Sequence, residues 1–94
     1  MSSATHVKLG KLIREYREKK GLTQFEVAQM LGHSSSQFMS LMERGLSKIP
    51  FETLGKFVVI LGIPESKVMG LLMSDYEEKL RAKFVDGKTK VVGK

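Results

Sequence analysis

The sequence predicts an all-α domain of five helices, of which the last is extended. Apolar residues recur at three- and four-residue spacings in five segments, and glycines stand where four of these segments would end. No segment shows a convincing strand pattern. A chain of 94 residues fits one domain with a single core. Because cysteine is absent, disulfides and thiolate metal ligands are excluded.

The first two helices are predicted from an apolar stripe and from a start signal. The stripe of the first helix is formed by residues three and four apart, Leu9, Leu12, Ile13 and Tyr16. Gly21 stands where this helix would end. Thr23 is a preferred N-cap for the second helix, and Glu26 three residues later completes a capping box. Gly32 ends this short second helix.

The remaining three helices are separated by short connections. Ser35 is the expected N-cap of the third helix, and Gly45 would end it. The fourth runs from about Phe51 to Leu61. The fifth follows Pro64 and is expected to reach about Lys83, with a close packing contact at Gly70. Its inward face is predicted to carry Val68, Leu71, Leu72, Tyr76, Leu80 and Phe84.

Three parts are expected along the chain. Residues 1–7 would form an N-terminal arm, residues 8–84 the folded domain, and residues 85–94 a mobile basic tail. One core is expected from the inward faces of the first four helices. Its predicted members are Leu12, Ile13, Tyr16, Val27, Ala28, Leu31, Met39, Met42, Leu54, Phe57, Val58 and Leu61.

Charge and composition narrow the function classes. The net charge of +6 favours nucleic acid or an acidic membrane face as partner, although solubility alone would also account for it. No apolar run approaches the ~20 residues that cross a bilayer, and no signal peptide is visible, so a cytoplasmic location is expected. No catalytic or metal-ligand constellation stands at useful spacing, so we expect neither an enzyme nor a cofactor.

The second and third helices form one tight unit, Thr23 to Gly45, and a short turn of this kind makes the two helices cross steeply. Six short runs in and around this unit form a recognisable pattern: Leu9-Gly10-Lys11-Leu12-Ile13-Arg14, Gly21-Leu22-Thr23-Gln24, Val27-Ala28-Gln29-Met30-Leu31-Gly32, Glu43-Arg44-Gly45, Leu54-Gly55-Lys56-Phe57 and Leu61-Gly62-Ile63. Together they resemble the phage-repressor-like, or Cro/C1-type, helix-turn-helix proteins of the xenobiotic-response-element family. The resemblance covers about residues 8–75.

The resemblance implies a lambda-repressor-like domain whose third helix enters the major groove of double-stranded DNA. The positions that would contact bases are Ser35, Ser36, Gln37, Ser40 and Leu41. The positions that would contact the DNA backbone are Gln24, Arg44, Ser47 and Lys48. Glu43 is interpreted as structural, pairing with a basic side chain or capping an amide.

The expected function is sequence-specific DNA binding by a transcriptional repressor. A homodimer would place its two recognition helices in successive major grooves, ~34 Å apart. Candidate dimer surface is supplied by the fifth helix and by three residues in or directly after the loop before the fourth helix, Leu46, Ile49 and Phe51. Phe51 stands where the family often has a Ser N-cap, so the fourth helix lacks that cap. An alternative is a protein-interaction adaptor that has the same fold and binds DNA weakly or not at all.

Overall fold

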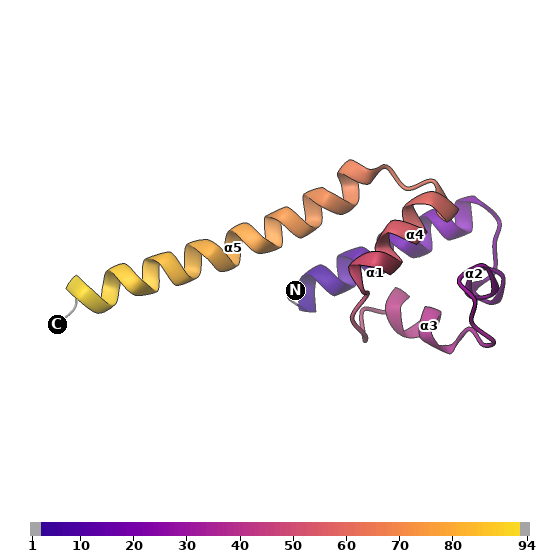
Figure 1. Cartoon of the computed structure of the whole chain (residues 1–94), viewed down its shortest axis with the longest axis horizontal. Helices are drawn as coiled ribbons and strands as arrows, with labels where there is room; N and C mark the ends of the chain where they lie inside the picture. The colour runs from indigo at the N-terminus through magenta and orange to yellow at the C-terminus, as the bar shows by residue number, and fades with distance from the viewer. Residues whose placement is uncertain (1–2, 93–94) are drawn as a thin grey trace.

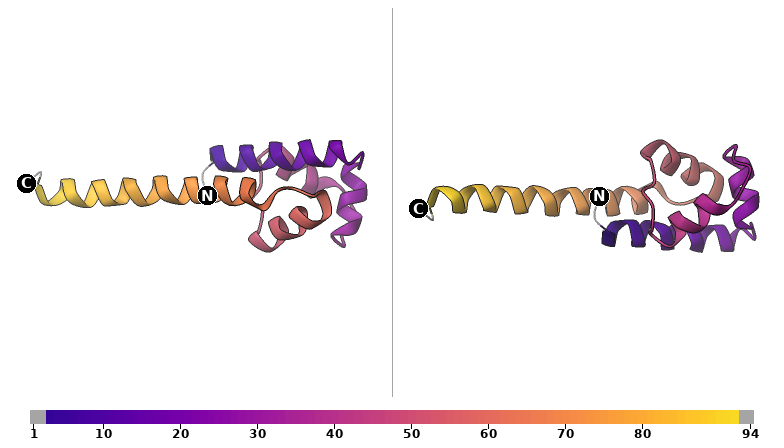
Figure 2. Two further views of the ribbon diagram at one scale, coloured as in Figure 1. Left: turned by 90° about the horizontal axis from the view of Figure 1, so that it is seen from above. Right: turned by 90° about the horizontal axis from the view of Figure 1, so that it is seen from below.

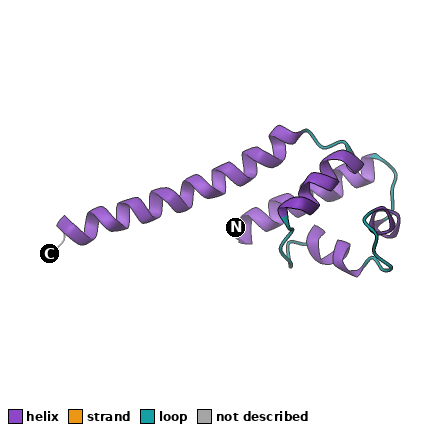
Figure 3. Cartoon of the chain, in the orientation of Figure 1, coloured by secondary structure: helices purple, strands orange, loops and turns teal. Residues whose placement is uncertain are grey.

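The protein is built from five helices that leave a long arm outside the globule (Figure 1). A computed structural model describes residues 3–92, and within them helices are joined only by loops and turns (Figure 3). The elements are α1 (Ser3–Lys19), α2 (Gln24–Met30), α3 (Gln37–Glu43), α4 (Phe51–Leu61) and α5 (Glu65–Val92). The predicted fold class, an all-α domain with an extended last helix, is confirmed.

The core lies where α1 packs against α3, α4 and the first part of α5. Most of the predicted core residues are buried, but Leu12, Tyr16, Leu31 and Val58 are only partly buried against them. The sequence reading missed four buried members. These are Leu9, Ile49, Ile63 and Val68, of which Leu9 and Val68 stand on the predicted apolar faces of the first and last helices but not among the predicted core residues.

Gly10 sets the distance between α1 and α3. A Cβ atom at this position would collide with the main-chain oxygen of Met42 and would lie 2.6 Å from that of Glu43. Main-chain atoms at a helix end cannot move aside as a flexible side chain would. The absence of a side chain at Gly10 therefore lets the two helices touch, and α3 is seated directly on α1.

Both ends of the chain differ from the prediction. The expected N-terminal arm is helical from Ser3, and the buried Thr5 hydroxyl donates to Asp75 Oδ1 over 2.8 Å, which ties α1 to α5. The expected end of the last helix near Lys83 is wrong, because α5 continues to Val92 through most of the predicted tail. Ion pairs one turn apart support the extension, namely Arg81 with Glu77 and Lys90 with Asp86. Residues 93 and 94 lie outside the described residues.

The second half of α5 projects from the globule, so the molecule measures 57 × 24 × 18 Å (Figure 2). Tyr76, Leu80 and Phe84 were predicted to face inward, but each is more than half exposed. Gly70 also differs from expectation, since the space beside it is open. Although α5 has 28 residues, neither it nor any other helix within residues 3–92 is long and apolar enough to cross a membrane.

Candidate nucleic-acid interface

The start of α2 is fixed by the predicted capping box. The Glu26 main-chain N–H donates to Thr23 Oγ1 over 3.0 Å, and the Thr23 N–H donates to Glu26 Oε1 over 2.9 Å. These hydrogen bonds lower the pKa of Glu26 below its ordinary value of 4.5, with the backbone N–H of Thr23 as the larger cause. Two main-chain donors that the helix itself leaves unpaired are thus satisfied.

The turn between α2 and α3 is one residue longer than predicted, because α3 begins after Ser36 and not after Ser35. Gly32 adopts a left-handed conformation with φ of +83°, and the His33 N–H returns to the Ala28 carbonyl over 2.9 Å. The N-cap of α3 is Ser36, which makes no side-chain capping bond, so the assignment of Ser35 was wrong by one residue. Residues 33–36 therefore connect the left-handed turn at Gly32 to the first residue of α3, Gln37.

The outward face of α3 is a line of three residues spaced four and three apart, Gln37, Leu41 and Arg44. The opposite face is buried and consists of Met39, Met42 and Glu43. Gln37 and Arg44 are exposed, and Leu41 is half-buried. Because α3 packs against the core through its opposite face, these three residues are available to contact a binding partner.

A shallow hollow of about 260 Å³ lies at the start of α3. Its lining is His33, Ser34, Ser35, Gln37, Phe38 and Leu41. Three of these six were expected base contacts. The other two expected base contacts are Ser36 and Ser40, which are half-buried and do not line the hollow.

Sequence reasoning missed His33 as part of this surface. Its ring lies 4.0 Å from that of Phe38, centroid to centroid, at an interplanar angle of 35°. This stacking holds the turn against the first residues of α3. His33 and Phe38 are five residues apart across a turn, and no helix or strand spacing predicts a contact between such residues.

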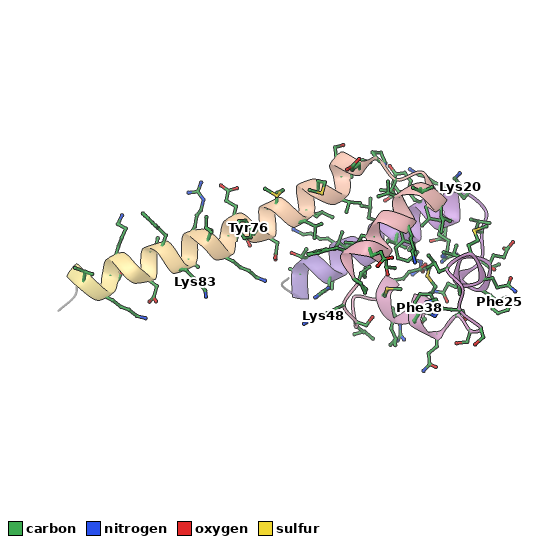
Figure 4. All side chains as sticks on the ribbon, in the orientation of Figure 1. Lys20, Phe25, Phe38, Lys48, Tyr76 and Lys83 are labelled. Carbon is green, nitrogen blue, oxygen red and sulfur yellow. The ribbon has the colours of Figure 1, made fainter. Side chains whose placement is uncertain are left out.

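The expected backbone contacts fall into two groups. Arg44 and Lys48 are exposed and Ser47 is half-buried, all at the end of α3 or in the loop after it. The Arg44 Nε donates to the Ser40 carbonyl over 3.2 Å, which lays its side chain along α3. Gln24 is half-buried, and its amide Nε2 donates to Glu43 Oε1 over 3.0 Å. Figure 4 shows Lys48, Phe38 and Phe25 along one edge of the molecule, and Lys20 on the opposite edge.

A buried ion pair joins the helices of this site. Arg17 Nε donates to Glu43 Oε2 over 2.6 Å, and the two side chains are only 12 % and 2 % exposed. A second guanidinium nitrogen donates to Glu43 Oε1 over 3.0 Å, and the third to the Leu22 carbonyl over 2.8 Å. The hydrogen bond to Glu43, with the charge of its carboxylate, raises the pKa of Arg17. The structural interpretation of Glu43 is confirmed.

Together with Gln24, this pair connects α1, the α1–α2 loop, the first turn of α2 and the end of α3. Three hydrogen bonds of known direction fix the carboxylate of Glu43, so α3 cannot rotate about its own axis without breaking them. The crossing geometry of α2 and α3 is therefore held by side-chain bonds as well as by apolar packing.

The loop before α4 does not present all of its predicted dimer surface. Ile49 is 2 % exposed and belongs to the core, so its assignment to an interface is wrong. By contrast, Leu46 and Phe51 are 65 % and 71 % exposed and stay available to a partner. The N-cap of α4 is Pro50, and no side chain caps this helix, as the sequence indicated.

Two short helices crossing over a tight turn, with one face of the second left free, define a helix-turn-helix DNA-binding domain of the kind found in transcription regulators. A family model described as helix-turn-helix matches residues 13–68, which is more than half of the chain. The chain belongs to this family, the Cro/C1-type helix-turn-helix proteins. No curated protein and no solved structure matches it at a significant level.

Proposed function

We propose that the protein binds double-stranded DNA sequence-specifically as a homodimer and represses transcription by occupying its site. The observation that carries this proposal is the free line on α3, Gln37, Leu41 and Arg44, beside a turn that holds the helix at the surface. A helix presented in this way fits the major groove of B-form DNA, which is about 12 Å wide. The net charge of +6 assists association with a polyanion.

Gln37 is the proposed discriminating residue. Its planar amide offers one donor and one acceptor, the pair that matches N7 and N6 of adenine in the major groove. Leu41, one turn further along α3, is placed to touch a thymine methyl group. Ser35, Ser36 and Ser40 would add weaker contacts, because a hydroxyl accepts or donates to several bases alike.

The proposed backbone contacts are Gln24, Arg44, Ser47 and Lys48. Arg44 and Lys48 carry positive charge at the end of α3, where the chain would leave the groove and meet phosphates. Gln24 donates only one of its two amide hydrogens to Glu43. Its second amide hydrogen is proposed to donate to a phosphate, with Glu43 holding the amide in position.

The test compares two variants on two duplexes. The preferred site is first selected from a random duplex library, and binding is then titrated with salt on that site and on a scrambled one. Gln37→Ala should weaken binding to the selected site by ~1–3 kcal/mol and relax the preference at one base pair. Arg44→Ala should weaken binding to both duplexes alike and reduce the salt slope by about one.

Lys20→Ala is the matched control, because it removes one charge from the edge of the molecule opposite Lys48 (Figure 4). It should leave both the affinity for the selected site and the salt slope nearly unchanged. If Gln37→Ala weakens both duplexes equally, Gln37 is a backbone contact and the proposed readout is wrong. If the unmodified protein binds no duplex, the DNA-binding proposal fails and the adaptor alternative gains.

A further inference from the structure

One side of α5 carries an unbroken apolar line that the globule does not use. The line follows the 3.6-residue period of a straight helix over six turns. We call it the α5 stripe, and it consists of Met69, Met73, Tyr76, Leu80, Phe84, Gly87 and Val91. Apart from the glycine, its members are between 46 % and 73 % exposed. Monomeric proteins rarely leave so long a contiguous apolar surface uncovered.

The first half of this stripe borders a groove. The groove lies between α4 and α5 and has a volume of about 590 Å³. Phe51 and Val59 of α4 form one wall, and the other is formed by Met69, Leu72, Met73 and Tyr76 of α5. The second half of the stripe, from Leu80 onward, stands on the projecting arm outside the globule (Figures 1 and 2). A single chain therefore carries both an apolar groove and an apolar helix that it cannot place in its own groove.

The order of the stripe is the same when it is read from either end. From Leu80 the next members lie four residues away on both sides, then seven, then eleven. Tyr76 mirrors Phe84, Met73 mirrors Gly87, and Met69 mirrors Val91. A line with this symmetry meets itself in register when a second copy is turned end for end, as a two-fold axis requires.

We propose that two copies of the protein pair through antiparallel α5 helices centred on Leu80, each arm lying in the groove of the other copy. This inference rests on the homodimer of the proposed function and specifies how it is built. Phe84 enters the partner's groove beside Tyr76 of the partner subunit. Gly87 gives room to Met73 of the partner subunit, since the space at its Cβ position is open. Val91 reaches Met69 of the partner subunit.

The apolar area available is of the size that a stable dimer needs. Tyr76, Phe84 and Phe51 are 59 %, 69 % and 71 % exposed. With ~150–250 Å² on each aromatic side chain, these three residues expose about 400 Å² per copy. A standard interface buries ~800 Å² from each partner, and the aliphatic members of the stripe and groove supply the remainder. A parallel pair would instead leave both grooves empty, because the two arms would run together away from the globules.

The natural chain contains no cysteine, so single cysteines report the pairing directly. Met73→Cys and Gly87→Cys chains are mixed in equal amounts without DNA and oxidised. The antiparallel pairing predicts a disulfide between the two different chains, because it brings their Cα atoms within the ~7 Å that a disulfide spans. Neither variant alone should cross-link, whereas Leu80→Cys should cross-link with itself. Ala82→Cys, on the opposite side of α5, is the control that should stay uncoupled.

Sedimentation of Leu80→Glu provides a second measurement. Leu80 is exposed in the single chain, so the variant should keep its helical circular dichroism while its dimer dissociation constant rises at least about 100-fold. Ala82→Glu should not change that constant. Self-coupling of Met73→Cys, or a natural chain that is monomeric at all concentrations, would overturn the pairing. A dimer that cross-links as expected but binds no duplex would instead leave the pairing intact and remove the proposed DNA function.

Discussion

Gly10 shows how one missing side chain positions α3, the helix proposed to enter the major groove. The main chain of α3 at Met42 and Glu43 rests where a Cβ atom would be. Any side chain would push α3 away from α1 and would strain the bonds between Arg17 and Glu43, which cross the same contact. The identity of residue 10 thus controls both the core and the surface that would meet DNA.

We expect Gly10→Ala to destabilise the protein by about 3 kcal/mol, since overpacking against main chain typically costs ~1–3 kcal/mol and neither helix can yield easily. Urea unfolding followed by circular dichroism measures the change. Gly70→Ala is the control, because it too lies inside a helix but has open space beside it. That variant should be stabilised by about 0.5–1 kcal/mol. Equal effects of the two substitutions would contradict the close-contact explanation.

Glu43 supplies the second prediction at this scale. Glu43→Gln removes the charge that pairs with the nearly buried Arg17, and loss of one partner of such a pair costs about 3 kcal/mol of folding free energy. Glu18→Gln on α1 is a matched control, since its ion pair with Arg14 is exposed on both sides. There the change should be below about 0.5 kcal/mol. Similar losses for both variants would show that burial does not govern the Glu43 pair.

The role of Glu43 was predictable from the sequence, but its partner was not. Glu43 follows Met42 at the end of the third helix, and it was predicted to have a structural role, as partner of a basic side chain or as cap of an amide. Arg17 lies 26 residues earlier, on another helix, among many other basic residues of α1. The pairing is decided by how closely α1 and α3 approach, and residue spacing does not encode that distance.

Among the elements, α2 was the most predictable, and its capping box has a pH signature. The pKa of Glu26 is lower in the folded protein than its ordinary 4.5, so its contribution to stability is present above that pH and is lost as the pH falls through the folded value. We therefore expect the natural protein to exceed Glu26→Gln in unfolding free energy at neutral pH. The difference should close as the pH falls below about 4.5.

Denaturant titrations of both chains between pH 7 and pH 3 measure this difference. Glutamine keeps an acceptor oxygen for the Thr23 N–H but has no charge, so only the ionisation is tested. A gap that stays constant over the whole range would mean that the carboxylate contributes nothing beyond a neutral hydrogen bond.

The ends of α3 and α5 were predicted less well, each for a physical reason. Serine is a good N-cap at either of two adjacent positions, and the left-handed turn at Gly32 selects Ser36 over Ser35. Gly87 lies in the predicted tail, yet α5 passes through it, and the ion pair between Lys90 and Asp86 spans it one turn apart. Local patterns define where helices exist better than where they end.

At the scale of the whole molecule, the fold divides into a globule and an arm. The sequence predicted an apolar face from Val68 to Phe84, and the inward assignment of Tyr76, Leu80 and Phe84 assumed that one chain could cover them. The globule is too small to do so, since Leu71 and Leu72 are the last hydrophobic residues of α5 that pack against its core. The periodicity correctly predicted that α5 has an apolar face. In the proposed dimer, this face is covered by α5 and the groove of the second copy.

The length of the arm bears on the mechanics of the DNA that would be bound. Helix α3 lies at the end of the molecule away from the free end of α5 (Figure 1). With Leu80 at the two-fold axis, the two Glu65 residues stand about 45 Å apart at a rise of ~1.5 Å per residue. This exceeds the ~34 Å between successive major grooves, so the half-sites should be more than one turn apart rather than adjacent. The base pairs between the two half-sites would not contact the protein. The energy needed to bend this spacer depends on its sequence, so the spacer sequence should affect the affinity of the dimer for DNA.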